Sequence, residues 1–157
     1  MLQLDLPGRN KVLNLEYLVL DMNGTISVDG QLPEGLLEKI AVLKERFKVI
    51  LLTADTFGKG QEAAKKLDID FLTVSPENGL KDKQDFVERL DSEKTVAIGN
   101  GFNDMGMLKT AALSIVIIGR EGCCVEALKS ADIAVCSIMD ALDLLINPLR
   151  IIATLRC

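Results

Sequence analysis

Short apolar runs recur along the whole chain, and segments with helical periodicity separate them. The runs are rich in Val, Ile and Leu, as expected for strands buried on both faces of a sheet. We predict six such strands, at Tyr17–Leu20, Val49–Thr53, Phe71–Ser75, Val96–Gly99, Ser114–Ile118 and Ile133–Cys136. Apolar and polar residues alternate over Leu2–Leu6, which indicates an additional antiparallel strand at the edge of this sheet.

The segments between these strands are predicted to be helices. The first opens near Pro33, a residue favoured in a first helical turn, and its apolar face holds Leu36, Leu37, Ile40 and Leu43. The others are expected at Gly58–Leu67, Asp82–Leu90, Asp104–Ala111, Glu121–Ala131 and Ile138–Ile146, with a break near Pro148. Alternating strands and helices form parallel sheets with right-handed crossovers. The predicted fold is therefore a single α/β, Rossmann-like domain over residues 1–157, with helices on both faces of a mainly parallel sheet.

Composition narrows the function classes. Hydrophobic residues make up 48% of the 157 residues but aromatic ones only 4%, so the core must be built from aliphatic side chains. The formal net charge is −5, with Lys and Arg dispersed among Asp and Glu, which argues against a nucleic-acid partner. No apolar window is long enough for a membrane span, and no charged leader precedes an apolar run. We therefore expect a cytoplasmic protein without a membrane partner.

The chain has no histidine, which excludes Ser-His-Asp and Cys-His catalysis and HExxH metal sites. Its four cysteines lack the spacing of a zinc site or a disulfide framework. The adjacent Cys123 and Cys124 are interpreted as ordinary thiols rather than as a soft-metal site, and their role stays open. Chemistry must therefore rest on carboxylates, hydroxyls, amines, amides or thiols.

Polar residues follow the predicted strands at the edge where parallel sheets bind ligands. Asp21 follows the first of the six strands, and a carboxylate there can attack phosphorus to form an aspartyl-phosphate. Gly24 lets the chain turn so that main-chain N–H groups face an incoming phosphoryl group. Thr53 ends the second strand and offers a hydroxyl to a phosphate oxygen. Asp55, just beyond it, is interpreted as a helix cap.

Two further positions complete this pattern. Lys83, or with less support Lys81, opens a later helix and can neutralise a phosphoryl group and its nucleophile. The turn Gly99–Gly101 leads to Asp104, an acidic residue at a helix start that can anchor magnesium. A divalent ion is what phosphoryl transfer requires.

Together these segments resemble the motifs of the haloacid-dehalogenase (HAD) superfamily, and more closely the phosphorylation domain of P-type ATPases. The matching segments are Leu20–Thr25, Leu52–Thr53, Lys83 with its helix, Gly99–Asp104 and Ser130–Val135, within a resemblance that covers residues 15 to 155. The greatest likeness is to the small soluble P-type ATPase-like HAD proteins. The resemblance implies a cap-less HAD core that acts as a Mg²⁺-dependent phosphatase or phosphotransferase, through an aspartyl-phosphate on Asp21.

The resemblance also implies roles for individual residues. The catalytic set would be Asp21, Asn23 and Lys83; the phosphate-binding set Met22, Asn23, Thr53, Ala54 and Lys83; the magnesium ligands Asp21, the Asn23 main-chain carbonyl, Asn100 and Asp104; and the supporting residues Gly24, Thr25, Gly99, Gly101 and Asn103.

Two positions depart from the family pattern. Asn23 stands where HAD phosphatases carry a general acid/base aspartate, and an amide side chain cannot act as a general acid or base at neutral pH. Asn100 stands where they carry a metal-binding aspartate. We therefore expect slow turnover, a preference for good leaving groups and weakened metal affinity. A non-catalytic or phospho-accepting regulatory module on the same fold is the alternative interpretation.

The sequence leaves no room for a cap domain. Between Asn23 and Pro33 only a small hairpin fits, with Asp29–Gly30 as its turn, and one helix and one strand lie between Thr53 and Lys83. The open site favours a bulky or macromolecular phosphorylated substrate, or a neighbouring subunit that acts as a lid. The apolar stretch Leu142–Leu149 is expected to pack onto the sheet, although a contact within a homo-oligomer is left open.

Overall fold

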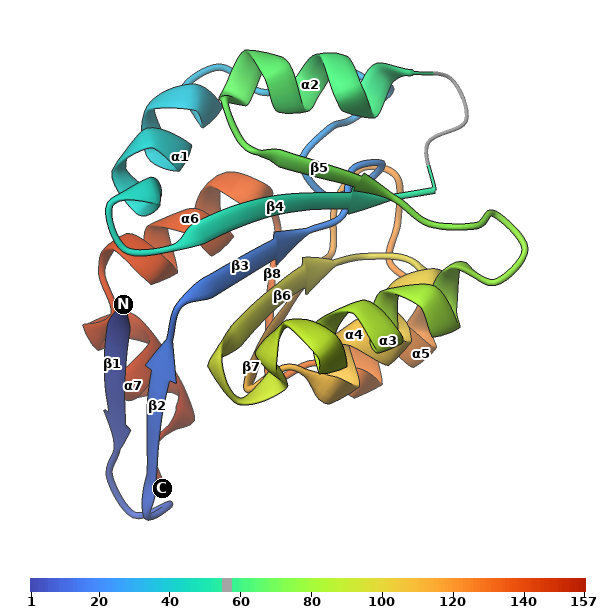
Figure 1. The fold of residues 1–157 in the computed structure, drawn as a ribbon. Helices are drawn as coiled ribbons and strands as arrows, with labels where there is room; N and C mark the ends of the chain where they lie inside the picture. Colours follow the sequence, from blue (N-terminus) through green and yellow to red (C-terminus); the bar gives the residue numbers. More distant parts are fainter. Residues whose placement is uncertain (55–57) are drawn as a thin grey trace.

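The computed structural model describes residues 1–54 and 58–157, so the predicted cap at Asp55 lies outside the described residues. Six parallel strands form one sheet in the order β5-β4-β3-β6-β7-β8 (Figure 1). Their bounds are β3 (Tyr17–Leu20), β4 (Lys48–Thr53), β5 (Asp70–Thr73), β6 (Thr95–Gly99), β7 (Leu113–Ile117) and β8 (Ile133–Val135). All six predicted strands are confirmed, with ends that differ from the prediction by at most two residues.

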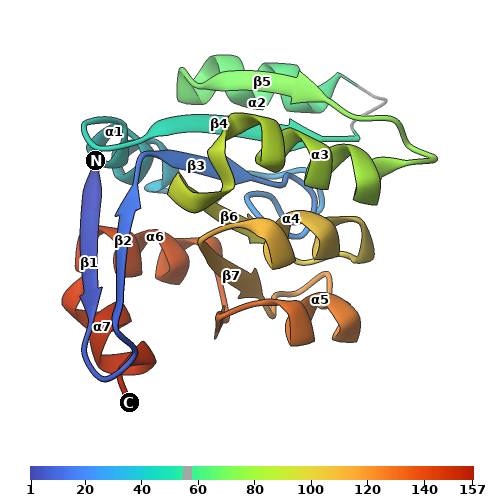
Figure 2. The same ribbon diagram turned by 60° about the horizontal axis from the view of Figure 1, so that its bottom comes forward.

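Helices cover both faces of this sheet, as predicted (Figures 1 and 2). One layer holds α1 (Leu36–Lys44), α2 (Lys59–Leu67) and α6 (Ile138–Ile146); the other holds α3 (Gly79–Asp91), α4 (Met105–Thr110) and α5 (Val125–Ser130). Short 3-10 turns, η1 (Ser92–Lys94) and η2 (Phe102–Asp104), precede β6 and α4. The fold is thus the three-layer α/β arrangement that the alternation of elements indicates.

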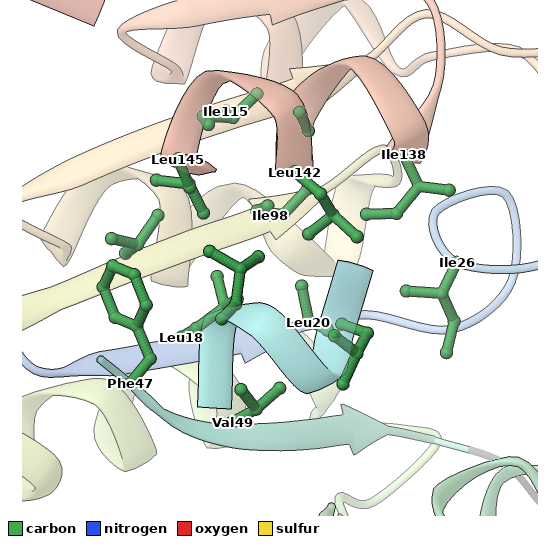
Figure 3. Packing of buried hydrophobic residues seen from close by; sticks show 14 of the residues in the cluster. Leu18, Leu20, Ile26, Phe47, Val49, Ile98, Ile115, Ile138, Leu142 and Leu145 are labelled. Carbon is green, nitrogen blue, oxygen red and sulfur yellow. The ribbon is translucent and has the colours of Figure 1, made fainter. Parts of the chain in front are cut away.

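Alternate residues of β3 supply the two cores. Leu18 and Leu20 point into the cluster beneath α6, where Figure 3 shows them near Leu142 and Leu145. Val19 points the other way, into a smaller cluster with residues of α3, α4 and α5. A strand buried on both faces needs apolar residues at every position, which is why the sequence shows continuous runs instead of alternation.

The N-terminal strand corrects one prediction. β1 (Leu2–Leu6) does not join the edge of the main sheet but pairs antiparallel with β2 (Lys11–Leu15), a strand that we did not predict. This two-stranded sheet contacts α7 (Leu149–Leu155), another element absent from the prediction (Figure 2). The break near Pro148 is confirmed, but the helix resumes directly after it because proline is well suited to a helix start.

Several helix ends also differ from the prediction. α1 begins at Leu36 instead of near Pro33, and Leu37 is 45% exposed rather than on the buried face. α3 begins three residues before Asp82, at Gly79. The segment expected to be helical from Glu121 becomes helical only at Val125, because Gly119 and Gly122 close a turn that interrupts it.

The predicted hairpin is present. Val28 and Gln31 exchange main-chain hydrogen bonds of 3.0 and 2.9 Å around Asp29 and Gly30, which both have positive φ. Within the described residues, no further domain interrupts the chain between β3 and α1 or between β4 and α3. Leu142 and Leu145 are fully buried, whereas Leu149 is 77% exposed. None of the described helices combines the length and apolar character needed to span a bilayer.

Candidate active site

The site lies where the strand order reverses. From β3 the chain builds β4 and β5 on one side, and it returns to place β6 on the other. Because Leu20 pairs with Ile98, Asp21 lies at the carboxyl end of β3 beside the turn that follows β6, and its N–H donates to the Ile98 carbonyl at 3.0 Å. Thr53 is buried at the end of β4, on the opposite side of β3. Open α/β sheets bind ligands at this position, beyond the carboxyl ends of the strands where the strand order reverses.

Lys83 forms the centre of the site. It reaches in from α3 with a fully buried side chain, and its Nζ lies 2.6 Å from Asp21 Oδ1 and 2.6 Å from Asp104 Oδ1. Lys81, the alternative left open by the sequence, is exposed and pairs with Asp85. The structure therefore brings Lys83, and not Lys81, to the nucleophile predicted from the sequence.

Both oxygens of Asp104 accept hydrogen bonds from the site itself. Its Oδ1 accepts from Lys83, and its Oδ2 accepts from the main-chain N–H groups of Asn100 and Gly101, each at 2.9 Å. The carboxylate also lies so close to Gly99 that a Cβ there would be 2.5 Å from its Cγ. Asp104 thus holds the turn and Lys83 in place, and its role as a metal ligand stays a prediction.

Asp21 and Asn100 meet at the hydroxyl of Thr25. Thr25 Oγ1 lies 3.2 Å from Asp21 Oδ2 and 3.2 Å from Asn100 Oδ1. Gly24 allows this close approach, because its φ is +75° and a Cβ there would lie 2.2 Å from Asn100 Nδ2. Two glycines that the sequence marked as supporting residues, Gly24 and Gly99, are therefore required by contact.

Burial and charge set the protonation of this cluster. Burial raises the pKa of Asp21 to about 6, with a further rise from Asp104 that is partly offset by Lys83. Burial alone would lower the pKa of Lys83, but the attraction and hydrogen bonds of the two carboxylates raise it above its ordinary value. At neutral pH Asp21 is therefore ionised and Lys83 charged, the state that nucleophilic attack on a phosphoryl group requires.

The oxygens of the cluster suit a hard divalent cation. The Thr25 hydroxyl carries one hydrogen, so it cannot donate to Asp21 Oδ2 and Asn100 Oδ1 at once, and one of them is left for another partner. Carboxylate, amide and main-chain oxygens are the donors that Mg²⁺ takes. Within residues 1–54 and 58–157, no group of three His, Cys, Asp or Glu side chains is arranged for a metal. A cation here would therefore depend on the Asn100 amide as well as on Asp21.

The other predicted residues surround this centre. Met22 is buried, Asn23 is exposed, and Ala54 is half-buried after β4. The main-chain N–H of Asn23 donates to no acceptor in the part of the chain that the structure describes, so it is available to a phosphate oxygen. Asn103 lies half-buried in the turn with Gly101.

Sequence reasoning missed the segment that holds Asn100 from behind. Gly122 accepts from Asn100 Nδ2 at 3.2 Å, and the Cys124 N–H donates to the Asn100 carbonyl at 2.8 Å. The one available signal was Gly122 itself, a glycine inside a segment with a helical pattern. Cys123 and Cys124 are free thiols, and both are half-buried.

No family model matches the chain. Two curated proteins of Methanocaldococcus jannaschii do: the uncharacterized protein MJ0073, 46% identical over 77 residues that are 49% of this chain and 83% of that protein; and the uncharacterized protein MJ0072, 49% identical over 39 residues that are 25% of this chain and 89% of that protein. These identities establish a family relationship between sequences.

Among solved structures, the cobalt-bound deoxy-D-mannose-octulosonate 8-phosphate phosphatase of Haemophilus influenzae is similar with a TM-score of 0.71, at 14% identity over 85% of this chain and 88% of that one. A protein described as a HAD family hydrolase from Streptomyces avermitilis has a TM-score of 0.62, with 21% sequence identity; the match covers 78% of this chain and 76% of that one. The 3-deoxy-D-manno-octulosonate 8-phosphate phosphatase of Moraxella catarrhalis, solved with magnesium and phosphate, has a TM-score of 0.68, with 15% sequence identity. The match covers 85% of this chain and 86% of that one. The chain therefore belongs to the same family as MJ0073 and MJ0072, and its fold is that of the HAD-family hydrolases.

Proposed function

We propose that this protein is a divalent-metal-dependent phosphatase or phosphotransferase that attacks phosphorus with Asp21. The observation that carries the proposal is the buried ammonium of Lys83, bonded to Asp21 and Asp104 at the point where the strand order reverses. A buried ion network of this kind contributes little to net stability, since desolvation offsets the attraction. Its position at the ligand-binding edge favours a chemical role. That solved structures of similar fold include phosphatases with bound cobalt or magnesium supports the same assignment.

In the proposed reaction, a carboxylate oxygen of Asp21 forms a bond to phosphorus while the bond to the leaving-group oxygen breaks. Lys83 neutralises the charge on the phosphoryl oxygens, and the Asn23 N–H with the Thr53 hydroxyl orients them. Water then attacks the aspartyl-phosphate and releases phosphate. Asp21, the Asn100 amide oxygen and the Asn23 carbonyl would hold Mg²⁺, which when bound neutralises phosphoryl charge.

Asn23 makes the two proton transfers slow. Its carboxamide cannot protonate the leaving group or take a proton from the attacking water at neutral pH. General acid/base catalysis contributes about 10²- to 10⁴-fold to rates, so turnover should lack a factor of this size. Acyl and aryl phosphates should be better substrates than alkyl phosphates, because their carboxylate and phenolate leaving groups depart without needing a proton. Since no inserted domain interrupts the described residues around the site, we extend the proposal to bulky or macromolecular phosphorylated substrates.

Phosphate release tests this proposal. We expect Mg²⁺-dependent release from acetyl phosphate and p-nitrophenyl phosphate, which falls to background in Asp21→Asn. Asn23→Asp should raise the rate on alkyl phosphates by about tenfold to hundredfold, because the added carboxyl group can shuttle a proton. Asn14→Asp, an exposed substitution on β2, is the matched control and should change nothing. If Asn23→Asp gives no gain on any substrate, Asn23 is not the residue that limits turnover.

The same assay separates the enzyme from the regulatory alternative. A protein that takes one phosphoryl group onto Asp21 but releases no phosphate above background would be a phospho-accepting module. Absence of both acceptance and release would favour a non-catalytic binding module on this fold.

A further inference from the structure

Hydrogen bonds within the chain hold both the nitrogen and the oxygen of the Asn100 carboxamide. Nδ2 donates to the Gly122 carbonyl at 3.2 Å, and Oδ1 accepts from the Thr25 hydroxyl at 3.2 Å. The residue is 9% exposed, and its main-chain carbonyl accepts from the Cys124 N–H at 2.8 Å. A flipped amide would set Oδ1 against the Gly122 carbonyl with no hydrogen between them. The contacts therefore fix the amide oxygen toward Thr25 and Asp21.

The turn after β7 is built to present this carbonyl. The Gly122 N–H donates to the Gly119 carbonyl at 3.0 Å, and Gly122 has a φ of +84°, which favours glycine. The turn ends where the Cys124 N–H bonds Asn100. Two main-chain groups from one turn thus hold one side chain and its backbone.

A carboxylate at position 100 would not fit these surroundings without a cation. One of its oxygens would face the Gly122 carbonyl, and two acceptors in a buried contact repel each other. It would also add a charge to a cluster in which Asp21, Asp104 and Lys83 already sum to one negative charge. The amide avoids both effects.

We propose that the turn 119–124 is a support for the metal site: it positions the Asn100 amide oxygen toward the cation and favours an amide over a carboxylate there in the metal-free protein. The proposal rests on the proposed function in one respect, that a cation binds between Asp21 and Asn100. On this proposal, the Asn100 amide allows the site to keep its structure when no metal is bound. Restoring the aspartate of the family pattern should make the protein depend on the metal.

Thermal unfolding of Asn100→Asp tests this at pH 7.5, first in EDTA and then along a Mg²⁺ titration. In EDTA we expect the midpoint to fall by about 5 °C, from the lost hydrogen bond and the added charge. Mg²⁺ should recover at least half of that loss and should raise the midpoint of the variant more than that of the original protein, because the cation offsets the added charge. Asn14→Asp adds the same charge on an exposed strand, and its midpoint should stay within about 1 °C in both conditions.

Asn100→Ala covers the case in which the aspartate variant does not fold. It removes the Nδ2 donor and the Oδ1 ligand without adding charge, so Mg²⁺ should stabilise it less than the original protein. An unchanged or raised midpoint of Asn100→Asp in EDTA would overturn the preference for an amide. A loss that Mg²⁺ does not reduce would overturn the placement of the oxygen toward a cation. Neither readout needs turnover, so an inactive protein with the expected shifts would refute the proposed function alone.

Discussion

Replacing Lys83 with methionine should destabilise the protein more than any other single change in the site. The substitution keeps a long side chain but leaves Asp21 and Asp104 without their shared cation, each previously 2.6 Å from Nζ. Breaking a buried ion pair by removal of one partner costs about 3–5 kcal/mol, since the remaining charge is buried and unpaired. Urea unfolding at pH 7.5 measures the loss, and phosphate release should fall to background.

Lys81→Met is the matched control, two residues away on the same helix. Its ammonium is exposed and pairs with Asp85, so its removal should cost no more than about 0.5 kcal/mol. Asp21→Asn in the Lys83→Met background removes one of the two unpaired charges and should restore part of the lost stability. A loss below about 1 kcal/mol in Lys83→Met would contradict the description of this lysine as the buried partner of both carboxylates.

Asp21→Asn should stabilise the metal-free protein at neutral pH while it abolishes activity. The pKa of Asp21 is raised from 3.8 to about 6, so the native protein binds this proton more tightly than the unfolded chain does. The destabilising contribution of Asp21 is therefore absent below about pH 4 and grows as the pH rises toward 6. A shift of this size corresponds to about 2–3 kcal/mol above pH 7.

The measurement is urea unfolding in EDTA from pH 4 to pH 8. The stability of Asp21→Asn relative to the original protein should increase over that range by about 2 kcal/mol and level off above pH 7. Asp82→Asn, a partly buried carboxylate on α3 that accepts from the Ser75 N–H, is a control for loss of an aspartate outside the cluster. A difference that does not vary with pH would contradict the raised pKa.

The sequence predicted much of this fold because buried parallel strands are continuous apolar runs. The strand-end rule then placed Asp21, Thr53 and Asn100 at one edge, and the structure brings Asp21 and Asn100 to the same hydroxyl. Lys81 and Lys83 lie two positions apart and therefore point to different sides of their helix. The sequence pattern does not show which of these sides faces the end of the sheet. Packing of α3 against the sheet decides it.

Other features depend on contacts between residues distant in the chain. Leu2–Leu6 alternates as any half-buried strand does, and nothing local shows that its partner is β2 rather than the main sheet. The role of Asp104 follows from which of its oxygens are occupied, and this requires the position of Lys83 and of two N–H groups. The support of Asn100 by Gly122 joins positions 22 residues apart.

The central claim is that Asp21 forms the covalent bond to phosphorus, and intact-protein mass spectrometry after brief exposure to acetyl phosphate and Mg²⁺, with acid quench, tests it most directly. We predict an added mass of one phosphoryl group, located on Asp21 by peptide mapping and absent from Asp21→Asn. The slow hydrolysis expected from Asn23 should favour its accumulation. A protein that releases phosphate but carries no phosphoryl group, or carries it on another residue, would contradict the account.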